Sequence, residues 1–216
     1  MRSRSRPAGT GLRSLASVLA VAALVAACAG AGGSAPASPT TGAAGTPPPL
    51  GARETAYDPS WPAPALRLTD QDGRPFDLAS LRGTPVLVYF GYTHCPDVCP
   101  TTLADVREAL RLVEAPVGVV FVTIDPARDD AAAMKQYVDY YASGFTGLTG
   151  AEAEVAAAAD AWGVSYRKLE STSAAGYAMA HSTETYLLDA AGMLRHHLFF
   201  GASPELIAER IREVAG

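Results

Sequence analysis

A pair of cysteines between a strand and a helix constrains the fold of this chain more than any other feature. The apolar run Val86–Phe90 is typical of a central strand, and the pattern of Thr101–Val113 indicates a helix. Cys95 and Cys99 lie in the loop between them. On a helix or a tight loop, this spacing places the two Cβ atoms roughly 5–6 Å apart. Because that distance suits a disulfide and equally one soft metal ion held by two thiolates, both uses stay open.

The proline after the second cysteine bears on its reactivity. Proline is favoured at the first position of a helix, so Pro100 predicts that the helix starts there and that Cys99 is its N-cap. The positive end of the helix dipole would then favour the thiolate of Cys99 over the thiol. We therefore expect a lowered pKa for Cys99, which would make it a better nucleophile and a better metal ligand.

The first 28 residues are predicted to be a lipoprotein-type signal peptide. Met1–Arg13 carries four arginines and no acidic residue, and the apolar stretch Leu15–Ala27 is too short for a comfortable transmembrane span. This order is typical of a secretory signal. The small residues directly before Cys28 resemble a bacterial lipobox, in which the cysteine is lipidated and becomes the mature N-terminus. The alternatives are an ordinary signal with an incidental cysteine, or an uncleaved anchor.

Residues 29–60 are predicted to form a flexible tether. They consist mainly of Gly, Ala, Ser, Thr and Pro and have no hydrophobic periodicity. Thirty such residues have a root-mean-square reach of roughly 30 Å. The chain is thus predicted to be lipid-anchored at the extracytoplasmic face of the cell membrane, with a folded domain over residues 61–216.

That domain is predicted to be a single unit that does not bind nucleic acid. About 150 residues are enough to bury a core without structural disulfides. The chain has a net charge of -5 and no cluster of Lys and Arg within the domain. Nucleic-acid-binding domains carry basic patches, so the sequence argues against a nucleic-acid partner.

Beyond residue 61, strand patterns alternate with helix patterns. Strands are predicted at Leu66–Thr69, Phe76–Leu78, Val86–Tyr92, Val117–Ile124, Val164–Leu169, Thr183–Asp189 and Met193–Phe200. Helices are predicted at Thr101–Val113, from Asp129 or Asp130 to about Tyr141, at Ala151–Trp162, and at Pro204–Val214. The stretch Leu169–Ala180 is weakly patterned and is predicted to be a loop. The order indicates an α/β, thioredoxin-like fold: a central mixed sheet flanked by helices, with an N-terminal hairpin extension.

Candidate functional side chains follow three of the predicted strands. Cys95 and Cys99 follow the first central strand, Asp125 ends the second, and His181 precedes the terminal hairpin. Functional groups of α/β sheets collect at the carboxyl ends of parallel strands. Two thiolates and an imidazole suit Cu(I) or Cu(II), and less specifically zinc.

Residues 63–214 resemble the Sco/SenC copper proteins, which are needed to assemble the copper site of cytochrome c oxidase. The stretches that carry the resemblance are Gly91–Pro100, Thr123–Asp129, and His181-Ser182 ahead of Tyr186–Asp189. The resemblance implies that Cys95, Cys99 and His181 are the copper ligands and that Asp125 lies close by. One departure is Met179-Ala180, where many relatives have an acidic residue, which leaves open what orients His181.

Several candidate residues have a simpler interpretation as well. Without the cysteine motif, His181 would be taken for a solvated loop histidine, and Asp125 before Pro126 for turn chemistry. His94 is interpreted as a packing or orienting residue beside the site rather than as a ligand. Asp125 and His94 are therefore predicted to contact and orient the side chains that hold the metal rather than the metal itself.

Two functions of different classes follow. The first is a copper metallochaperone, not an enzyme, that passes one copper ion to a cuproprotein, which the resemblance implies is cytochrome c oxidase subunit II. The second is a thiol–disulfide oxidoreductase in which Cys95 and Cys99 form the redox disulfide with a client. Reductants of this fold place a cis-proline opposite the disulfide, whereas no proline occurs here between Pro126 and Pro204. Both functions can coexist, because a thiol reductant partner must open the disulfide before copper binds.

Overall fold

The computed structural model describes residues 54–170 and 176–216. The predicted signal peptide, Cys28 and residues 29–53 of the predicted tether lie outside the described residues. Within the described part of the chain, no helix is both long and apolar enough to span a membrane.

The described chain alternates strands and helices as the sequence pattern predicts. Its strands are β1 Glu54–Pro62, β2 Arg67–Asp70, β3 Pro75–Asp77, β4 Val86–Gly91, β5 Gly118–Thr123, β6 Phe145–Thr149, β7 Tyr166–Leu169, β8 Ala178–His181, β9 Thr185–Leu188 and β10 Met193–Leu198. Its helices are the 3₁₀ helix η1 Leu78–Leu81 and the α-helices α1 Val98–Arg111, α2 Ala131–Tyr141, α3 Glu152–Ala161 and α4 Pro204–Ala215.

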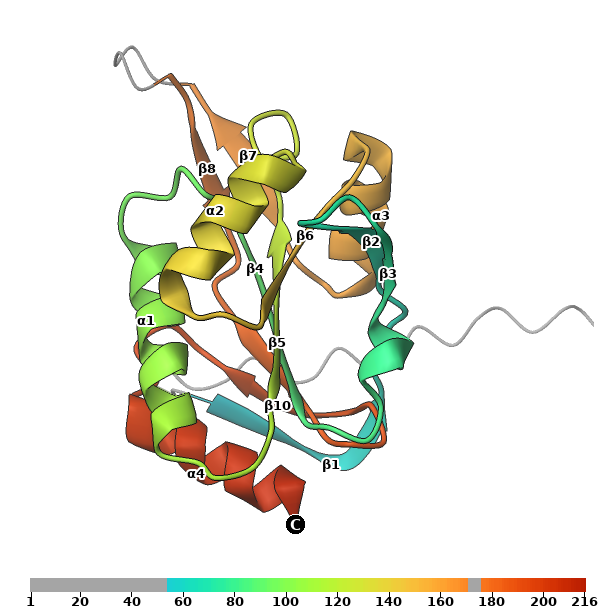
Figure 1. Ribbon diagram of the computed structural model, residues 1–216, viewed down its shortest axis with the longest axis vertical. Helices are drawn as coiled ribbons and strands as arrows, with labels where there is room; N and C mark the ends of the chain where they lie inside the picture. The colour runs from blue at the N-terminus through green and yellow to red at the C-terminus, as the bar shows by residue number, and fades with distance from the viewer. Residues whose placement is uncertain (1–53, 171–175) are drawn as a thin grey trace, which may run out of the picture. The chain divides into compact units, whose positions relative to one another are not determined.

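An eight-stranded mixed sheet forms the centre, in the order β1-β10-β9-β4-β5-β6-β2-β3. β4, β5 and β6 run parallel, and β9 pairs antiparallel with the other side of β4 (Figure 1). Every residue of β4 is buried, and so is every residue of β5 after the first. Their continuous apolar runs match what a parallel strand covered on both faces requires. The residues that follow the carboxyl ends of β4 and β5 are therefore attached to two fully packed strands.

Several predicted details are confirmed by the pairing and the caps. β2 and β3 form the N-terminal hairpin extension, and β9 and β10 form the terminal hairpin. Asp130 caps α2 by accepting the backbone N–H of Ala133 at 2.8 Å, so of the two predicted caps it is the one used. Ser203 caps α4 by accepting the backbone N–H of Leu206.

The first strand lies partly where the sequence predicted tether. β1 begins at Glu54 and pairs antiparallel with β10, so residues 54–60 belong to the main sheet. Tyr57 explains the difference, because its ring centroid lies 4.5 Å from that of Trp61 and its hydroxyl hydrogen-bonds His197 at 3.0 Å. Composition alone does not reveal the long-range contact between Tyr57 and His197.

Two short strands have no counterpart in the predicted elements. β6 joins β5 and β2, and β8 pairs with β7 in a separate two-stranded sheet. In Figure 1, β7 and β8 extend past α2 at the upper end of the view. The first three residues of β8 fall in the predicted loop Leu169–Ala180, and all four residues of the strand are only half-buried and give no clear apolar pattern. His181 is therefore the last residue of a strand rather than part of a loop.

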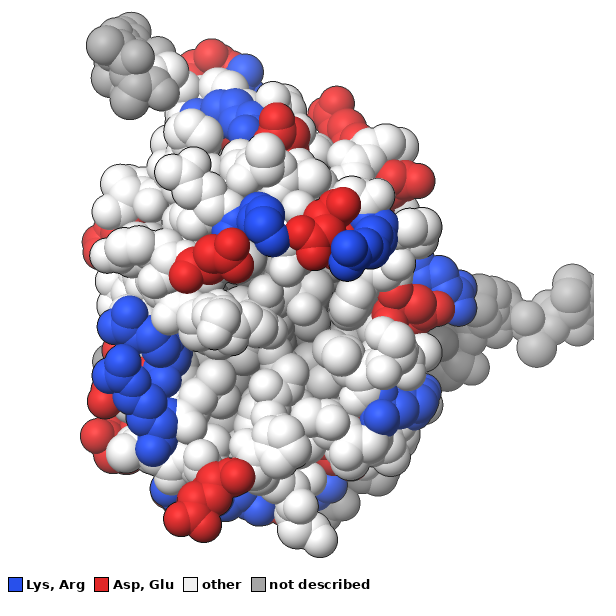
Figure 2. Space-filling model, in the orientation of Figure 1, with Lys and Arg blue, Asp and Glu red and all other residues white. Residues whose placement is uncertain are grey.

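Charged side chains on the face shown in Figure 2 are mostly mixed in sign. A small basic group lies over the lower part of α1, the helix that contains Arg107 and Arg111. Wide areas of that face carry no charge. On this face, the net charge of -5 is thus not concentrated in one acidic patch.

Candidate metal centre

Cys95, Cys99 and His181 come together at one end of the central sheet. Cys95 lies in the loop after β4, Cys99 in the first turn of α1, and His181 at the end of β8. Their potential ligand atoms all lie within 4.8 Å of one another, and the Cys99 sulfur is 3.5 Å from Nε2 of His181. In the described residues this is the only group of three or more His, Cys, Asp or Glu side chains close enough to share a metal ion. Two segments far apart in sequence thus supply one set of donors: the stretch from the end of β4 into α1, and the end of β8.

The two cysteines differ in their access to solvent. Cys99 is fully buried against the core, whereas Cys95 is half-buried at the surface. Neither cysteine is in a disulfide in this structure. The site is thus open on the Cys95 side and closed on the Cys99 side.

The absence of a side chain at Gly91 makes room for the Cys99 sulfur. A Cβ atom at this position, the last residue of β4, would lie 2.9 Å from the Cys99 sulfur and 2.8 Å from Cε2 of Phe121. Real Cβ contacts are longer than this, and Phe121 is fully buried and cannot retreat. Glycine at the end of β4 is therefore a steric requirement of the site.

A backbone carbonyl selects the tautomer of the neutral His181 ring. Nδ1 of His181 lies 2.5 Å from the carbonyl oxygen of Ser182, which can only accept a hydrogen bond. Nδ1 must therefore carry the proton, and in the neutral ring Nε2 keeps its lone pair toward Cys99. A metal-binding histidine is usually oriented by such a contact from its other nitrogen. The contact supplies an orienting partner for His181 without an acidic residue at position 179 or 180.

Two tyrosine rings flank His181, and sequence reasoning missed both. The ring centroid of Tyr92 lies 6.0 Å from that of His181 in an edge-on arrangement, and Tyr89 lies 6.4 Å away. Both tyrosines are almost fully buried. In the sequence, Tyr89 within β4 and Tyr92 just after it are recognisable only as residues of a buried core. Nothing in the sequence shows that β8 folds against them.

The pKa values of the two cysteines are shifted in opposite directions. The Cys99 thiol donates a hydrogen bond to the Cys95 sulfur, and with the Cys99 backbone N–H at 3.3 Å it lowers the pKa of Cys95 to about 4, against the effect of burial. The same thiol contact, with burial, raises the pKa of Cys99. At neutral pH the pair thus holds one proton, which lies on the buried sulfur of Cys99.

This result corrects the expectation for Cys99. α1 begins at Val98, so Cys99 is the second helical residue rather than the N-cap, and Pro100 is the third. Proline is tolerated there because the first-turn N–H groups have no partner within the helix. The thiolate expected at Cys99 lies instead at Cys95, because the Cys99 thiol donates its hydrogen bond to the Cys95 sulfur and burial disfavours a charge on Cys99.

The lowered pKa predicts that Cys95 reacts as a thiolate in mildly acidic solution. A free thiol has a pKa of about 8.5 and loses reactivity about tenfold per pH unit below it, whereas Cys95 stays ionised down to about pH 4. Because the folded pKa is the lower one, the stability that this group contributes is fully present above the unfolded pKa and is lost as pH falls through about 4. Alkylation of the reduced protein by iodoacetamide should label Cys95 nearly as fast at about pH 6 as at about pH 8.

Cys99→Ala is the control for this prediction. It removes the main cause of the shift, so the alkylation profile of Cys95 should move to higher pH. A wild-type profile that follows a free thiol would contradict the arrangement.

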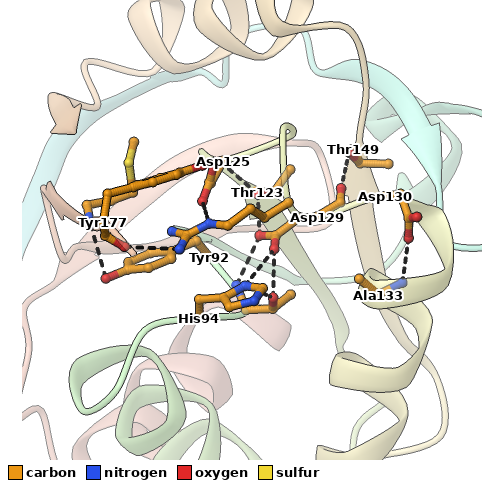
Figure 3. Close-up of polar contacts among 12 residues, drawn as sticks. Tyr92, His94, Thr123, Asp125, Asp129, Asp130, Ala133, Thr149 and Tyr177 are labelled. Atoms are coloured by element: carbon orange, nitrogen blue, oxygen red, sulfur yellow. Dashed lines mark hydrogen bonds and ion pairs between the residues drawn. The ribbon is translucent and has the colours of Figure 1, made fainter. Parts of the chain in front are cut away.

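Asp125 does not join the cysteines and the histidine, although it lies at the end of β5 as predicted. Its side chain is almost fully buried, and both of its oxygens are in use (Figure 3). Oδ2 accepts a hydrogen bond from Nε of Arg128 at 2.5 Å, and Oδ1 accepts one from the hydroxyl of Tyr177 at 2.7 Å. Asp125 is therefore a partner of other side chains rather than a member of the donor group.

His94 lies beside a second buried carboxylate, Asp129. The His94 ring is about half exposed, and its Nδ1 is 3.0 Å from the Thr93 hydroxyl and 3.6 Å from Oδ1 of Asp129 (Figure 3). Asp129 also accepts hydrogen bonds from the backbone N–H of Thr93 at 3.0 Å and from the hydroxyl of Thr123 at 2.6 Å. It thus ties the start of the cysteine loop to the end of β5. Sequence reasoning placed Asp129 in the stretch that carries the family resemblance and named it as a possible helix cap, but did not place it beside His94.

The comparisons with known proteins agree with this fold. The family model described as SCO1/SenC matches residues 59–216. A SCO2-like protein of Rickettsia conorii is 36% identical over 151 residues, which cover 68% of this chain and 74% of the relative. Among solved structures, Bradyrhizobium japonicum ScoI with copper bound is 34% identical with a TM-score of 0.65, covering 71% of this chain and 99% of that one. Yeast Sco1 with copper bound is 28% identical with a TM-score of 0.65, covering 71% and 87%.

Proposed function

The chain belongs to the SCO1/SenC family, and on that premise we propose that it is a copper metallochaperone whose metal ligands are Cys95, Cys99 and His181. The observation that carries the proposal is the meeting of two sulfurs and one imidazole nitrogen within 4.8 Å. Thiolates and imidazole form a donor set that suits copper, in particular Cu(I). Cu(II) would take a fourth ligand, such as a water molecule.

The electrostatics of the pair favour metal uptake. Cys95 is already a thiolate at neutral pH, and Nε2 of His181 keeps a free lone pair. Only the proton on Cys99 has to leave when the ion binds, so uptake releases about one proton from the pair. The raised pKa of Cys99 opposes the loss of that proton, and it weakens binding as the pH falls.

The unequal burial of the ligands suggests a direction for handing the ion on. Cys95 and His181 are half-buried, whereas Cys99 is enclosed. An incoming ligand of a recipient protein can therefore replace Cys95 or His181 first, and the Cys99 sulfur would be the last ligand to dissociate from the copper ion. Such stepwise exchange avoids releasing free copper.

The recipient we propose is a cuproprotein at the same membrane face. The family resemblance makes cytochrome c oxidase subunit II the first candidate. A lipid on Cys28 and a tether over part of residues 29–60 would hold the domain near such a recipient. The structure describes none of residues 1–53, so this part of the proposal rests on the sequence pattern.

Thiol–disulfide exchange is the second candidate function, and the pKa pattern favours it specifically. A half-buried thiolate at Cys95 beside a buried thiol at Cys99 is an arrangement suited to attack on a client disulfide followed by resolution. Exchange needs no histidine ligand, whereas copper binding by two thiolates and an imidazole does.

Metal analysis tests the proposed function. The reduced, purified protein should retain about one copper ion per chain after mixing with equal copper and zinc and removing unbound metal. The same treatment after oxidation of the cysteines should leave little copper bound. Retention of zinc in preference to copper, or of copper by the oxidised protein, would contradict the proposal.

Anchoring by Cys28 is a separate prediction. In a bacterial host that processes lipoproteins, Cys28→Ser should release the protein from the membrane fraction, because the residue that carries the lipid is gone. Copper bound per chain should not change, since Cys28 lies outside the donor group. Should the variant stay in the membrane fraction, the anchor is the uncleaved apolar stretch Leu15–Ala27.

A further inference from the structure

His181 is carried by an arm that has little support of its own. β7 and β8 pair with each other and with no strand of the main sheet among the described residues. Each is four residues long, and a two-stranded ribbon of this size is at best marginally stable in water. Yet His181 has to stay within reach of two cysteines that follow the carboxyl end of the buried strand β4.

Three side chains join this arm to the carboxyl end of β5. Asp125 accepts a hydrogen bond from the Tyr177 hydroxyl, one residue before β8, while Arg128 donates from Nε to Asp125 and from Nη1 to the Tyr177 carbonyl at 3.0 Å (Figure 3). The Arg128 guanidinium carbon also lies 3.7 Å from the centroid of the Tyr177 ring. We call Asp125, Arg128 and Tyr177 the arm clamp. Each of its members contacts the other two.

A neighbouring contact fixes the same arm closer to His181. The hydroxyl of Tyr92 accepts a hydrogen bond from the backbone N–H of Met179 at 3.2 Å. Arg128 lies 5.8 Å over the ring of Tyr92, so the clamp also adjoins the residue that makes this contact. The arm is thus held four and two residues before His181, at Tyr177 and at Met179.

The clamp is well enough enclosed to be strong. The side chains of Asp125 and Arg128 are only 5% and 18% exposed. Water therefore screens their ion pair much less than a surface pair, and the hydrogen bonds to the carboxylate are charge-assisted. Loss of one partner would leave a charge buried without its full set of contacts.

We propose that Arg128 and Tyr177 are positioning residues that hold His181 over the two cysteines before the metal arrives. The effect of this positioning on copper binding rests on the proposed copper function. The clamp itself is a property of the metal-free protein. If the arm moved freely, binding would have to order it, and the affinity would fall by the fraction of time that His181 is out of place. The clamp removes that cost and slows the departure of a bound ion.

Tyr177→Phe tests the clamp with little risk to folding. It removes the hydroxyl that Asp125 accepts from and keeps the ring, the Arg128 contacts and the buried ion pair. In the metal-free protein, amide hydrogen exchange in the peptide covering residues 176–182 should become about tenfold faster, while exchange in β4 stays unchanged. In the copper-loaded protein, transfer of Cu(I) to a bicinchoninate chelator should become roughly tenfold faster, the lower end of the range for the loss of a partner of a metal ligand.

Arg128→Lys provides a second variant. Lysine keeps the positive charge beside Asp125 but cannot donate to Asp125 and to the Tyr177 carbonyl from one rigid fork. It should produce the same faster exchange and faster copper transfer as Tyr177→Phe. Tyr140→Phe and Arg167→Lys are the matched controls, because both alter exposed residues outside the clamp, and both should behave as wild type.

The two proposals fail in different ways. Wild-type exchange rates at residues 176–182 in both Tyr177→Phe and Arg128→Lys would overturn the clamp, whatever the protein binds. Faster exchange with an unchanged rate of copper transfer would overturn its role in holding His181 for the metal. A wild-type protein that holds no copper, with arm exchange still faster in the variants, would overturn the copper function and leave the clamp as a contact of the metal-free arm.

Discussion

Replacing His181 with alanine should abolish the thiolate-to-Cu(II) charge-transfer absorption of the copper-loaded protein. The Nε2 atom that faces the Cys99 sulfur at 3.5 Å would be gone, and no other histidine belongs to the donor group. Loss of a residue that only supports a ligand typically costs about 10–100-fold in metal affinity, so loss of the ligand itself should cost more. Visible absorption and copper stoichiometry on the same preparation measure both effects.

The same variant separates the two candidate functions. The Cys95–Cys99 disulfide should still form and be reduced in His181→Ala, because exchange between sulfurs needs no imidazole ligand. His94→Ala is the matched control, since His94 is the other histidine near the cysteines and is about half exposed. Full copper binding by His181→Ala, together with loss of disulfide exchange with a client, would make the oxidoreductase the correct function.

Replacing Gly91 with alanine should damage both the fold and the site. The new Cβ would lie 2.8 Å from Cε2 of Phe121 and 2.9 Å from the Cys99 sulfur, so one of these buried groups must move. Overpacking of a core costs about 1–3 kcal/mol of unfolding free energy, which for a domain of this size lowers the melting temperature by roughly 2–4 °C per kcal/mol. Displacement of the sulfur should also lower copper affinity, by roughly tenfold or more.

Gly118→Ala is the control for this variant. Gly118 begins β5 in the same sheet, and a Cβ there would meet Cδ1 of Leu81 at 3.2 Å, a side chain that is only partly buried and can adjust. A small loss of stability with unchanged copper binding is expected. If Gly91→Ala binds copper as tightly as wild type, the steric requirement at the end of β4 is wrong.

The central strands could be predicted from the sequence because burial on both faces leaves long apolar runs. β4 and β5 are such runs, and their predicted positions are confirmed within one or two residues. β6 was missed because Phe145–Thr149 is short and contains Gly147, which usually weakens a strand. The structure explains this glycine, since a Cβ there would lie 3.1 Å from the Val138 side chain of α2.

Much of the candidate site was also visible in the sequence, but its internal organisation was not. The spacing of Cys95 and Cys99 and the strand order bring the reactive groups to one end of the sheet, where His181 joins them. The direction of the pKa shifts depends on which sulfur is buried, and no local pattern reveals that. The partners of Asp125 are likewise hidden, because Tyr177 is 52 positions away in a weakly patterned segment.

The coordination of the metal tests the central claim most directly, and X-ray absorption at the copper edge of the Cu(I)-loaded protein measures it. The arrangement of Cys95, Cys99 and His181 predicts two sulfur neighbours at about 2.3 Å and one imidazole nitrogen at about 2.0 Å, by analogy with zinc sites. Cys99→Ser should remove one sulfur, and His181→Ala should remove the imidazole scattering. A wild-type spectrum with only nitrogen and oxygen neighbours, or one left unchanged by both substitutions, would contradict the assignment.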